Sequence, residues 1–123
     1  MVRVLHCDDS LAYRRLIRAV LALERDIELV GEATGRDGLL EALAAAGPDV
    51  LLLDMVHGVT DADLAPELAA AAPGMAVIIL SGHPPERVDP GIRAMAAAHI
   101  TKSTAFAELT ETIRRVGART NVE

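Results

Sequence analysis

This chain of 123 residues contains very few aromatic side chains and a single cysteine. Tyr13 and Phe106 are the aromatic residues and tryptophan is absent, so a core has to be built from alanine, leucine, valine and isoleucine. Because Cys7 has no second cysteine to pair with, an internal disulfide is excluded, and we expect Cys7 to pack as a small buried hydrophobe. Hydrophobic residues make up 51% of the chain, which predicts one folded domain.

Long apolar runs and an excess of positive charge are also missing. No run approaches the roughly 20 residues of a membrane helix, so we expect no membrane partner. There is no charged-then-apolar leader with a small-residue cleavage site, and a single cysteine fits a reducing compartment, so we expect a cytoplasmic protein. The net charge of −6 argues against nucleic-acid binding by this chain alone.

Apolar, strand-like runs alternate along the chain with amphipathic, helix-like runs. We expect strands over residues 2–7, 27–33, 50–53, 76–80 and 99–101. We expect helices over residues 11–23, 35–46, part of 61–72, 90–97 and 104–117. Five such units with right-handed crossovers predict an α/β fold with a doubly wound, five-stranded parallel sheet. Residues 1–118 should form the domain, and residues 119–123 a frayed tail or the start of a linker.

Carboxylates stand where two of the predicted strands stop. Asp8 and Asp9 follow the first strand, and Asp54 follows the third. The carboxyl ends of parallel strands meet at one edge of a sheet, and that edge is where open α/β folds bind ligands. Carboxylates held close together repel one another unless a cation or a proton neutralises them, and an oxygen-only cluster suits Mg²⁺ with phosphate oxygens. The pattern therefore indicates phosphate chemistry.

A hydroxyl and an ammonium group complete the pattern at the same edge. Ser81 follows the fourth predicted strand and Lys102 follows the fifth. A lysine can offset the charge of a phosphoryl group, and a hydroxyl can hydrogen-bond to it. With these residues in this order, the whole chain strongly resembles the receiver domain of two-component response regulators. The segments 3–5, 26–33 and 48–50 look like those of receivers that precede helix-turn-helix output domains. The resemblance implies a flavodoxin-like sheet in the order 2-1-3-4-5.

The resemblance implies roles for the acidic residues. Asp54 would accept a phosphoryl group from a sensor histidine kinase or a phosphotransfer protein. Asp9 and Asp54 would ligate Mg²⁺ directly, together with the backbone carbonyl of Val56. Asp8 would act on the ion through water and would pair with Lys102.

The resemblance also implies which groups contact the phosphoryl oxygens. These are Lys102 and the Ser81 hydroxyl, helped by the backbone N–H groups of Val56 and Gly82. Ser81 and His99 would take the switch positions, although the family usually has tyrosine or phenylalanine where this chain has His99. The face made by residues 90–97, 99–101 and 104–117 is a candidate surface for self-association.

The chain departs from the family pattern around the site. The usual Met-Pro pair after the phosphoacceptor and the later glycine are replaced by His57, Gly58 and Ala62, and the usual proline after the lysine is Ser103. These changes remove no chemical group from the site, but they affect the loop after Asp54 and the aromatic switch.

Three functions are compatible with these residues. The first is a phosphorylation switch that is not an enzyme, apart from assisting its own phosphorylation and dephosphorylation. The second is a pseudo-receiver, a binding module that works without phosphorylation, and the altered loop after Asp54 supports it. The third is an aspartate-nucleophile phosphatase, which is disfavoured because such enzymes place an Asp-x-Asp pair after the first strand. Taken singly, each of these acidic residues would more often be a helix cap or a loop acid.

Overall fold

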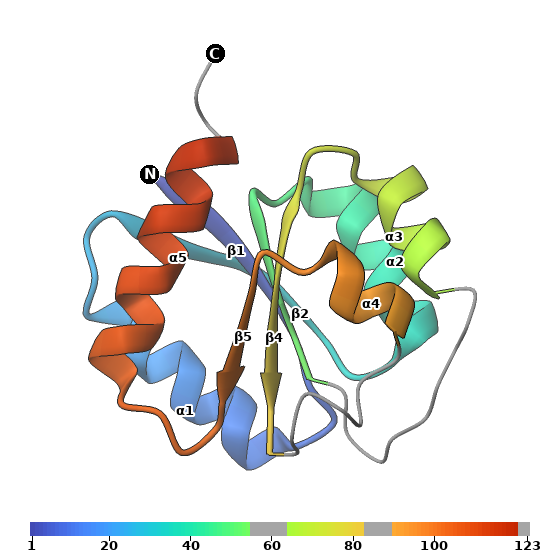
Figure 1. Cartoon of the computed structure of the whole chain (residues 1–123). Helices are drawn as coiled ribbons and strands as arrows, with labels where there is room; N and C mark the ends of the chain where they lie inside the picture. The colour runs from blue at the N-terminus through green and yellow to red at the C-terminus, as the bar shows by residue number, and fades with distance from the viewer. Residues whose placement is uncertain (55–63, 83–89, 121–123) are drawn as a thin grey trace.

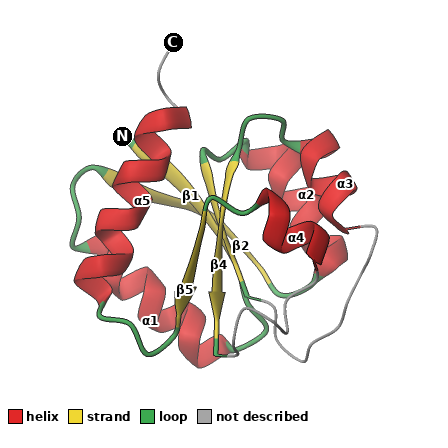
Figure 2. Ribbon diagram, in the orientation of Figure 1, coloured by secondary structure: helices red, strands yellow, loops and turns green. Residues whose placement is uncertain are grey.

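The computed structural model of the chain describes residues 1–54, 64–82 and 90–120. The strands in this part are β1 (Val2–Cys7), β2 (Ile27–Ala33), β3 (Val50–Leu53), β4 (Ala76–Ser81) and β5 (Ala98–Thr101). The helices are α1 (Leu11–Ala22), α2 (Arg36–Ala46), α3 (Leu64–Ala71), α4 (Pro90–Met95) and α5 (Phe106–Thr120). All strand pairs are parallel and their order is β2-β1-β3-β4-β5, which confirms the predicted fold (Figures 1 and 2).

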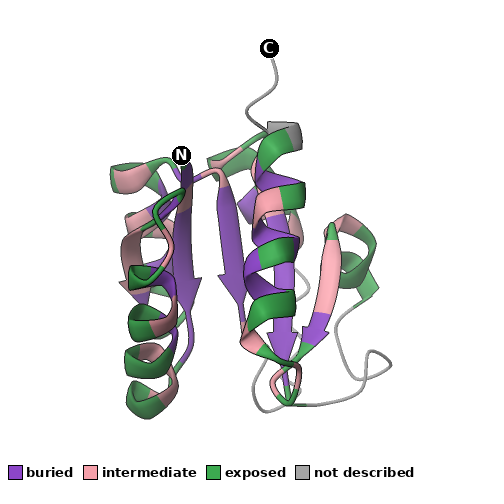
Figure 3. Ribbon diagram, turned by 90° about the vertical axis from the view of Figure 1, so that its left-hand side faces the viewer, coloured by how far each residue is buried: buried purple, intermediate pink, exposed green. Residues whose placement is uncertain are grey.

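Helices cover the sheet on both faces, and each face has its own hydrophobic core (Figure 1). Alternate residues of β3 point to opposite sides: Val50 and Leu52 join the core under α1 and α5, whereas Leu51 and Leu53 join the core under α2, α3 and α4. All four are fully buried, as Figure 3 shows for the central strands. This double burial explains why the strand is apolar throughout rather than alternating.

Local signals set several helix ends where the sequence predicts them. Ser10 caps α1, because its side chain accepts a hydrogen bond from the backbone N–H of Tyr13. Gly47 ends α2 in the left-handed conformation with φ of 55°, which favours glycine. Pro66 is the third residue of α3, where its missing N–H costs no intrahelical hydrogen bond.

The last helix differs from its predicted range. It begins at Phe106 rather than at residue 104 and continues through Gly117 to Thr120, so the first two residues of the predicted tail are helical. Gly117 lies inside this helix rather than at its end, at the point where α5 approaches β1. A Cβ atom at this position would lie 2.5 Å from Cγ1 of Val2, so the missing side chain lets α5 pack closely against β1. Helix α4 ends at Met95, two residues earlier than predicted.

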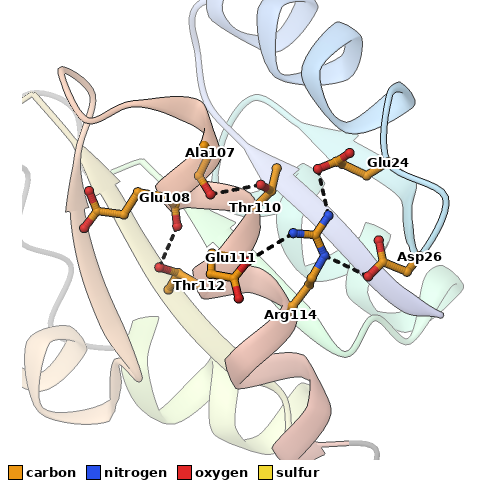
Figure 4. A network of polar contacts seen from close by, with 8 residues as sticks. All are labelled: Glu24, Asp26, Ala107, Glu108, Thr110, Glu111, Thr112 and Arg114. Atoms are coloured by element: carbon orange, nitrogen blue, oxygen red, sulfur yellow. Dashed lines mark hydrogen bonds and ion pairs between the residues drawn. The ribbon is translucent and has the colours of Figure 1, made fainter.

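Arg114 fastens α5 to the turn between α1 and β2 (Figure 4). Its Nη2 donates to Oε1 of Glu24 at 2.7 Å and its Nε donates to Oδ2 of Asp26 at 2.8 Å. A third contact, to Oε2 of Glu111 on the same helix, is longer at 3.4 Å. The hydrogen bond from Arg114 lowers the pKa of Asp26, and its two carboxylate partners raise the pKa of Arg114.

Strand β2 lies at an edge of the sheet and carries a bulge. Val4 pairs with Leu29 and Leu5 pairs with Gly31, so Val30 is an extra residue on β2. No helix among the described residues has the length and apolar character needed to cross a membrane.

Candidate functional site

Among the described residues of the predicted site, Asp8, Asp9, Asp54, Ser81 and Lys102 lie at the carboxyl edge of the sheet. Backbone hydrogen bonds extend the strand ladders by one residue beyond β3 and β5. The N–H of Asp54 donates to the carbonyl of Cys7 at 3.0 Å, and the N–H of Lys102 donates to the carbonyl of Ser81 at 3.0 Å. The N–H of Asp8 is fixed in the same way by the carbonyl of Ala33 at 2.9 Å. Ordinary strand pairing therefore sets where these side chains start.

Asp8 is a buried carboxylate with a partner on each oxygen. Its Oδ1 accepts a hydrogen bond from the backbone N–H of Ser10 at 2.8 Å. Its Oδ2 accepts a hydrogen bond from Nζ of Lys102 at 2.9 Å. Nη1 of Arg14 donates to the Asp8 backbone carbonyl at 2.7 Å, which ties α1 to the end of β1. The predicted pairing of Asp8 with Lys102 is present in the structure.

Lys102 reaches two carboxylates at once. Its Nζ lies 2.9 Å from Oδ2 of Asp8 and 3.2 Å from Oδ2 of Asp54, and its side chain is 22% exposed. Burial alone would lower the pKa of Lys102, but the hydrogen bond to Asp8 and the charge of Asp54 outweigh it, so the pKa is raised. The ammonium is therefore charged and shared between the ends of β1 and β3.

Asp54 is the least satisfied carboxylate of the site. Its side chain is 1% exposed, and neither of its oxygens has a hydrogen bond of good geometry within the described part of the chain, although Lys102 lies within ion-pair distance. Burial, followed by repulsion from Asp8, raises the pKa of Asp54 to about 6, despite the opposing effect of Lys102. A buried carboxylate in this condition favours a cation or an electrophile beside it.

Three carboxylates form a group that fits a divalent cation. Oxygen atoms of Asp8, Asp9 and Asp54 all lie within 4.8 Å of one another. Asp9 is exposed, so the group opens to solvent on its side. Oxygen-only ligands with room for water match the coordination that Mg²⁺ prefers.

An aromatic residue of α1, Tyr13, lies against this charged group, although its place in the sequence predicts no role for it. Nζ of Lys102 is 4.3 Å from the centre of the Tyr13 ring, a cation–π distance. The ring also contacts His6 in an edge-to-face arrangement, with the ring centres 6.0 Å apart. His6 is fully buried on β1, and burial lowers its pKa to about 4, so it is neutral at pH 7. One sequence signal could have indicated this contact: Tyr13 is one of only two aromatic residues of the chain, and it follows Asp9 by about one helical turn.

The two residues predicted to act as the switch lie on the neighbouring strands β4 and β5. Ser81 is the last residue of β4 and is fully buried, and Gly82 follows it in an exposed position. His99 lies on β5 opposite Ile79, and its two ring nitrogens are buried without a hydrogen-bond partner among the described residues. Ser81 therefore lies at the edge of the sheet beside Lys102. His99 lies on β5 two residues before Thr101, the residue that pairs with Ser81, and so is farther from that edge.

Several predicted residues fall outside the described part of the chain. These are Val56, predicted to contribute a carbonyl ligand and a backbone N–H, and the replaced positions His57, Gly58 and Ala62. The described carboxylates, Ser81 and Lys102 are the part of the predicted site that the geometry brings together.

Comparisons with known proteins give the same assignment. The family model described as the response regulator receiver domain matches residues 4–114. A protein-glutamate methylesterase/protein-glutamine glutaminase of Myxococcus xanthus is 39% identical over 121 residues, which are 94% of this chain and 34% of that protein. The transcriptional regulatory protein LiaR of Bacillus subtilis is 32% identical over 117 residues, which are 93% of this chain and 55% of LiaR. The chain thus spans about a third to about half the length of these curated relatives.

Solved structures agree with the sequence relatives. The signal receiver domain of a NarL response regulator from Mycobacterium tuberculosis superposes with a TM-score of 0.80 at 28% identity, covering 95% of this chain and 96% of that one. The response regulator domain of CheB from Thermotoga maritima superposes with a TM-score of 0.79, covering 100% of this chain and 98% of that one, and at 24% identity it supports the fold alone. The acidic edge, the paired lysine, the strand order and these matches lead to one conclusion: the chain belongs to the family of response regulator receiver domains of two-component systems, whose general function is that of a phosphoacceptor switch.

Proposed function

We propose that Asp54 is the phosphoacceptor of this receiver domain. The observation that carries the proposal is the position of Lys102, whose Nζ is shared between Asp8 at 2.9 Å and Asp54 at 3.2 Å. A carboxylate nucleophile needs no base when it is ionised, and an ammonium beside it can receive the charge of an incoming phosphoryl group. Neither Asp54 oxygen has a well-formed hydrogen bond within the described residues, which supports its availability for attack.

The same edge would hold Mg²⁺. Asp9 and Asp54 would ligate the ion directly with the backbone carbonyl of Val56, and Asp8 would reach it through water. The compact oxygen-only group of the three aspartates supports this assignment. When bound, the ion would neutralise the carboxylates and the phosphoryl oxygens.

The remaining groups would bind and orient the phosphoryl group. Lys102 would transfer part of its charge interaction from Asp8 to the phosphoryl oxygens, and the Ser81 hydroxyl would donate a hydrogen bond to them. The backbone N–H groups of Val56 and Gly82 would complete the contacts. The buried position of Ser81 at the end of β4 supports its role, and His99 would follow the Ser81 movement as the second switch residue.

The phosphoryl donor would be a sensor histidine kinase or a phosphotransfer protein, and the setting would be the cytoplasm. Activation would shift the population toward a conformation that self-associates through α4, β5 and α5. We propose that the chain catalyses no reaction beyond its own phosphorylation and dephosphorylation. The name of the methylesterase relative describes a protein about three times as long as the matched part, of which this chain covers 34%.

Intact-mass analysis after incubation with acetyl phosphate and Mg²⁺ tests the phosphoacceptor assignment. The parent protein should gain one phosphoryl adduct, and Asp54→Asn should gain none. Persistence of the adduct in Asp54→Asn would move the acceptor to another residue. A parent protein that never forms an adduct would instead favour a pseudo-receiver, and rapid turnover of the donor without an adduct would favour a phosphatase.

Thermal unfolding with and without Mg²⁺ tests the metal site separately. Ligand that binds only the folded protein stabilises it by mass action, so Mg²⁺ should raise the Tm of the parent. The increase should disappear in Asp9→Ala and remain in Glu41→Ala, which removes an exposed carboxylate from the middle of α2. Equal increases in all three proteins would place the ion elsewhere.

A further inference from the structure

We propose that Tyr13 is a positioning residue whose ring face fixes the ammonium group of Lys102 between Asp8 and Asp54. The inference concerns the unphosphorylated site and rests on the proposed function only for its consequence on phosphorylation. Three contacts converge on Lys102: the hydrogen bond to Asp8, the ion pair with Asp54 and the ring of Tyr13, whose centre lies 4.3 Å from Nζ.

A lysine side chain needs such a support at this place. Its four-carbon stem has several rotatable bonds, and its ammonium is a compact point charge without a preferred direction. Asp8 accepts a hydrogen bond at 2.9 Å while Asp54 lies at 3.2 Å in an ion pair, so Coulomb attraction draws the ammonium toward both carboxylates, but it does not fix the direction from which the flexible stem approaches. A ring face behind the ammonium restricts it to the side that faces the carboxylates, because the attraction of a cation to the face of an aromatic ring is directional.

The ring itself is well fixed. The backbone N–H of Tyr13 donates to the Ser10 side chain in the cap of α1, at 3.2 Å. The ring packs against the hydrophobic core under α1 and α5. The planes of the Tyr13 and His6 rings meet at an angle of 62°. His6, which contacts the ring in this edge-to-face arrangement, is itself fully buried on β1. Lys102 thus rests on a side chain that is held by the helix cap, the core and β1.

The sequence offers an unusually clean test. Lys102 is the only lysine and Tyr13 is the only tyrosine of the chain. Protein labelled with ¹³C,¹⁵N-lysine therefore gives a single set of lysine side-chain NMR signals. In the parent without Mg²⁺, the ε-protons of Lys102 should shift upfield because of the ring current and should show a nuclear Overhauser effect to the Tyr13 ring. Lysine signals at their free-amino-acid positions would overturn the inference.

Three substitutions separate positioning from simple packing. Tyr13→Phe keeps the ring face and should preserve the upfield shift. Tyr13→Leu and Tyr13→Met keep apolar bulk without a ring and should lose the shift. If Tyr13→Leu does not fold, Tyr13→Met takes its place in the comparison. Leu16→Ala, at a 43% exposed position of the same helix, controls for general weakening of α1 and should leave the shift unchanged. Retention of the shift in Tyr13→Leu or Tyr13→Met would overturn the inference.

Phosphorylation by acetyl phosphate gives the second readout. Tyr13→Leu should react about two- to fivefold more slowly than the parent, as a cation–π contact of ordinary strength implies, and Tyr13→Phe should restore the rate. A phosphorylated parent with an unchanged rate in Tyr13→Leu would refute the positioning role. A parent that never becomes phosphorylated, but whose lysine shift depends on the Tyr13 ring, would refute the proposed function and leave the positioning of Lys102 intact.

Discussion

Gly117→Ala should destabilise the domain, although alanine is normally the better helix former. The new Cβ atom would lie 2.5 Å from Cγ1 and 2.9 Å from Cγ2 of Val2, and both distances are shorter than real Cβ contacts allow. Val2 is β-branched and 8% exposed, so it cannot easily turn its methyl groups aside. Inserting a methyl group into a packed core costs about 1–3 kcal/mol, whereas the helix gains about 1 kcal/mol. The net loss should be about 1 kcal/mol, or about 4 °C in Tm for a domain of this size.

A double-mutant cycle in urea isolates the contact. Val2→Ala removes the two atoms that the new methyl group would strike, and alone it should cost about 1.5 kcal/mol for the lost burial. The double variant Val2→Ala with Gly117→Ala should be more stable than the sum of the two single losses predicts, by about 1 kcal/mol, because the two shortest contacts are removed and only the 3.2 Å contact to Cβ of residue 2 remains. Gly38→Ala is the matched control: it lies in α2 with nothing within 4 Å of a new Cβ, so it should gain about 0.5–1 kcal/mol. Additive losses, or a Gly117→Ala variant as stable as Gly38→Ala, would refute the close-approach reasoning.

Three further predictions concern residues outside the acidic site. Arg114→Met should lower the urea midpoint and flatten the acid limb of the stability curve. The hydrogen bond from Arg114 holds the pKa of Asp26 below its ordinary 3.8. The parent therefore has the full stabilisation from this pair above pH 3.8 and loses it as the pH falls through the lowered pKa. An equally steep acid limb in the variant would contradict this reasoning. Cys7 is buried, and burial raises the pKa of its thiol to about 12. Ellman's reagent should therefore label Cys7 only as fast as the protein unfolds. Rapid labelling without urea would argue against this packing. His99→Leu should raise the free energy of unfolding by about 1 kcal/mol at pH 8, because two buried nitrogens without described partners are removed, and a loss in urea titration would indicate a needed hydrogen bond.

Much of the fold follows from the sequence because the central strands carry two signals, an apolar run and a polar residue at the end of that run. Each of the runs at 50–53 and 76–80 is apolar throughout, as a strand covered on both faces must be, and each is followed by a polar residue. The parallel arrangement then brings those polar residues to one edge, so Asp54 and Ser81 could be placed together without knowledge of any side-chain conformation.

The finer features depend on contacts between residues that are distant in the sequence. A glycine near a helix end is usually read as a stop signal, and only the approach of Val2 explains why α5 continues through Gly117. The contact between Tyr13 and Lys102 depends on the rotamers of both side chains, and no local pattern specifies these. The bulge at Val30 likewise arises from the pairing of β2 with β1 rather than from a turn residue.

The close seating of α5 on β1 has a consequence for the order in which the chain folds. Arg114 is joined to the α1–β2 turn by hydrogen bonds that span 88 and 90 residues, and Gly117 lies against the second residue of the chain. The core under α1 and α5 therefore stays open on the ribosome until nearly all described residues have emerged, whereas the core under α2, α3 and α4 uses helices made earlier. Contacts of this length slow folding, because the loop must close before its ends gain anything from meeting. Newly made chains should accordingly pass through a stage in which one face of the sheet is covered and the other is still exposed to chaperones.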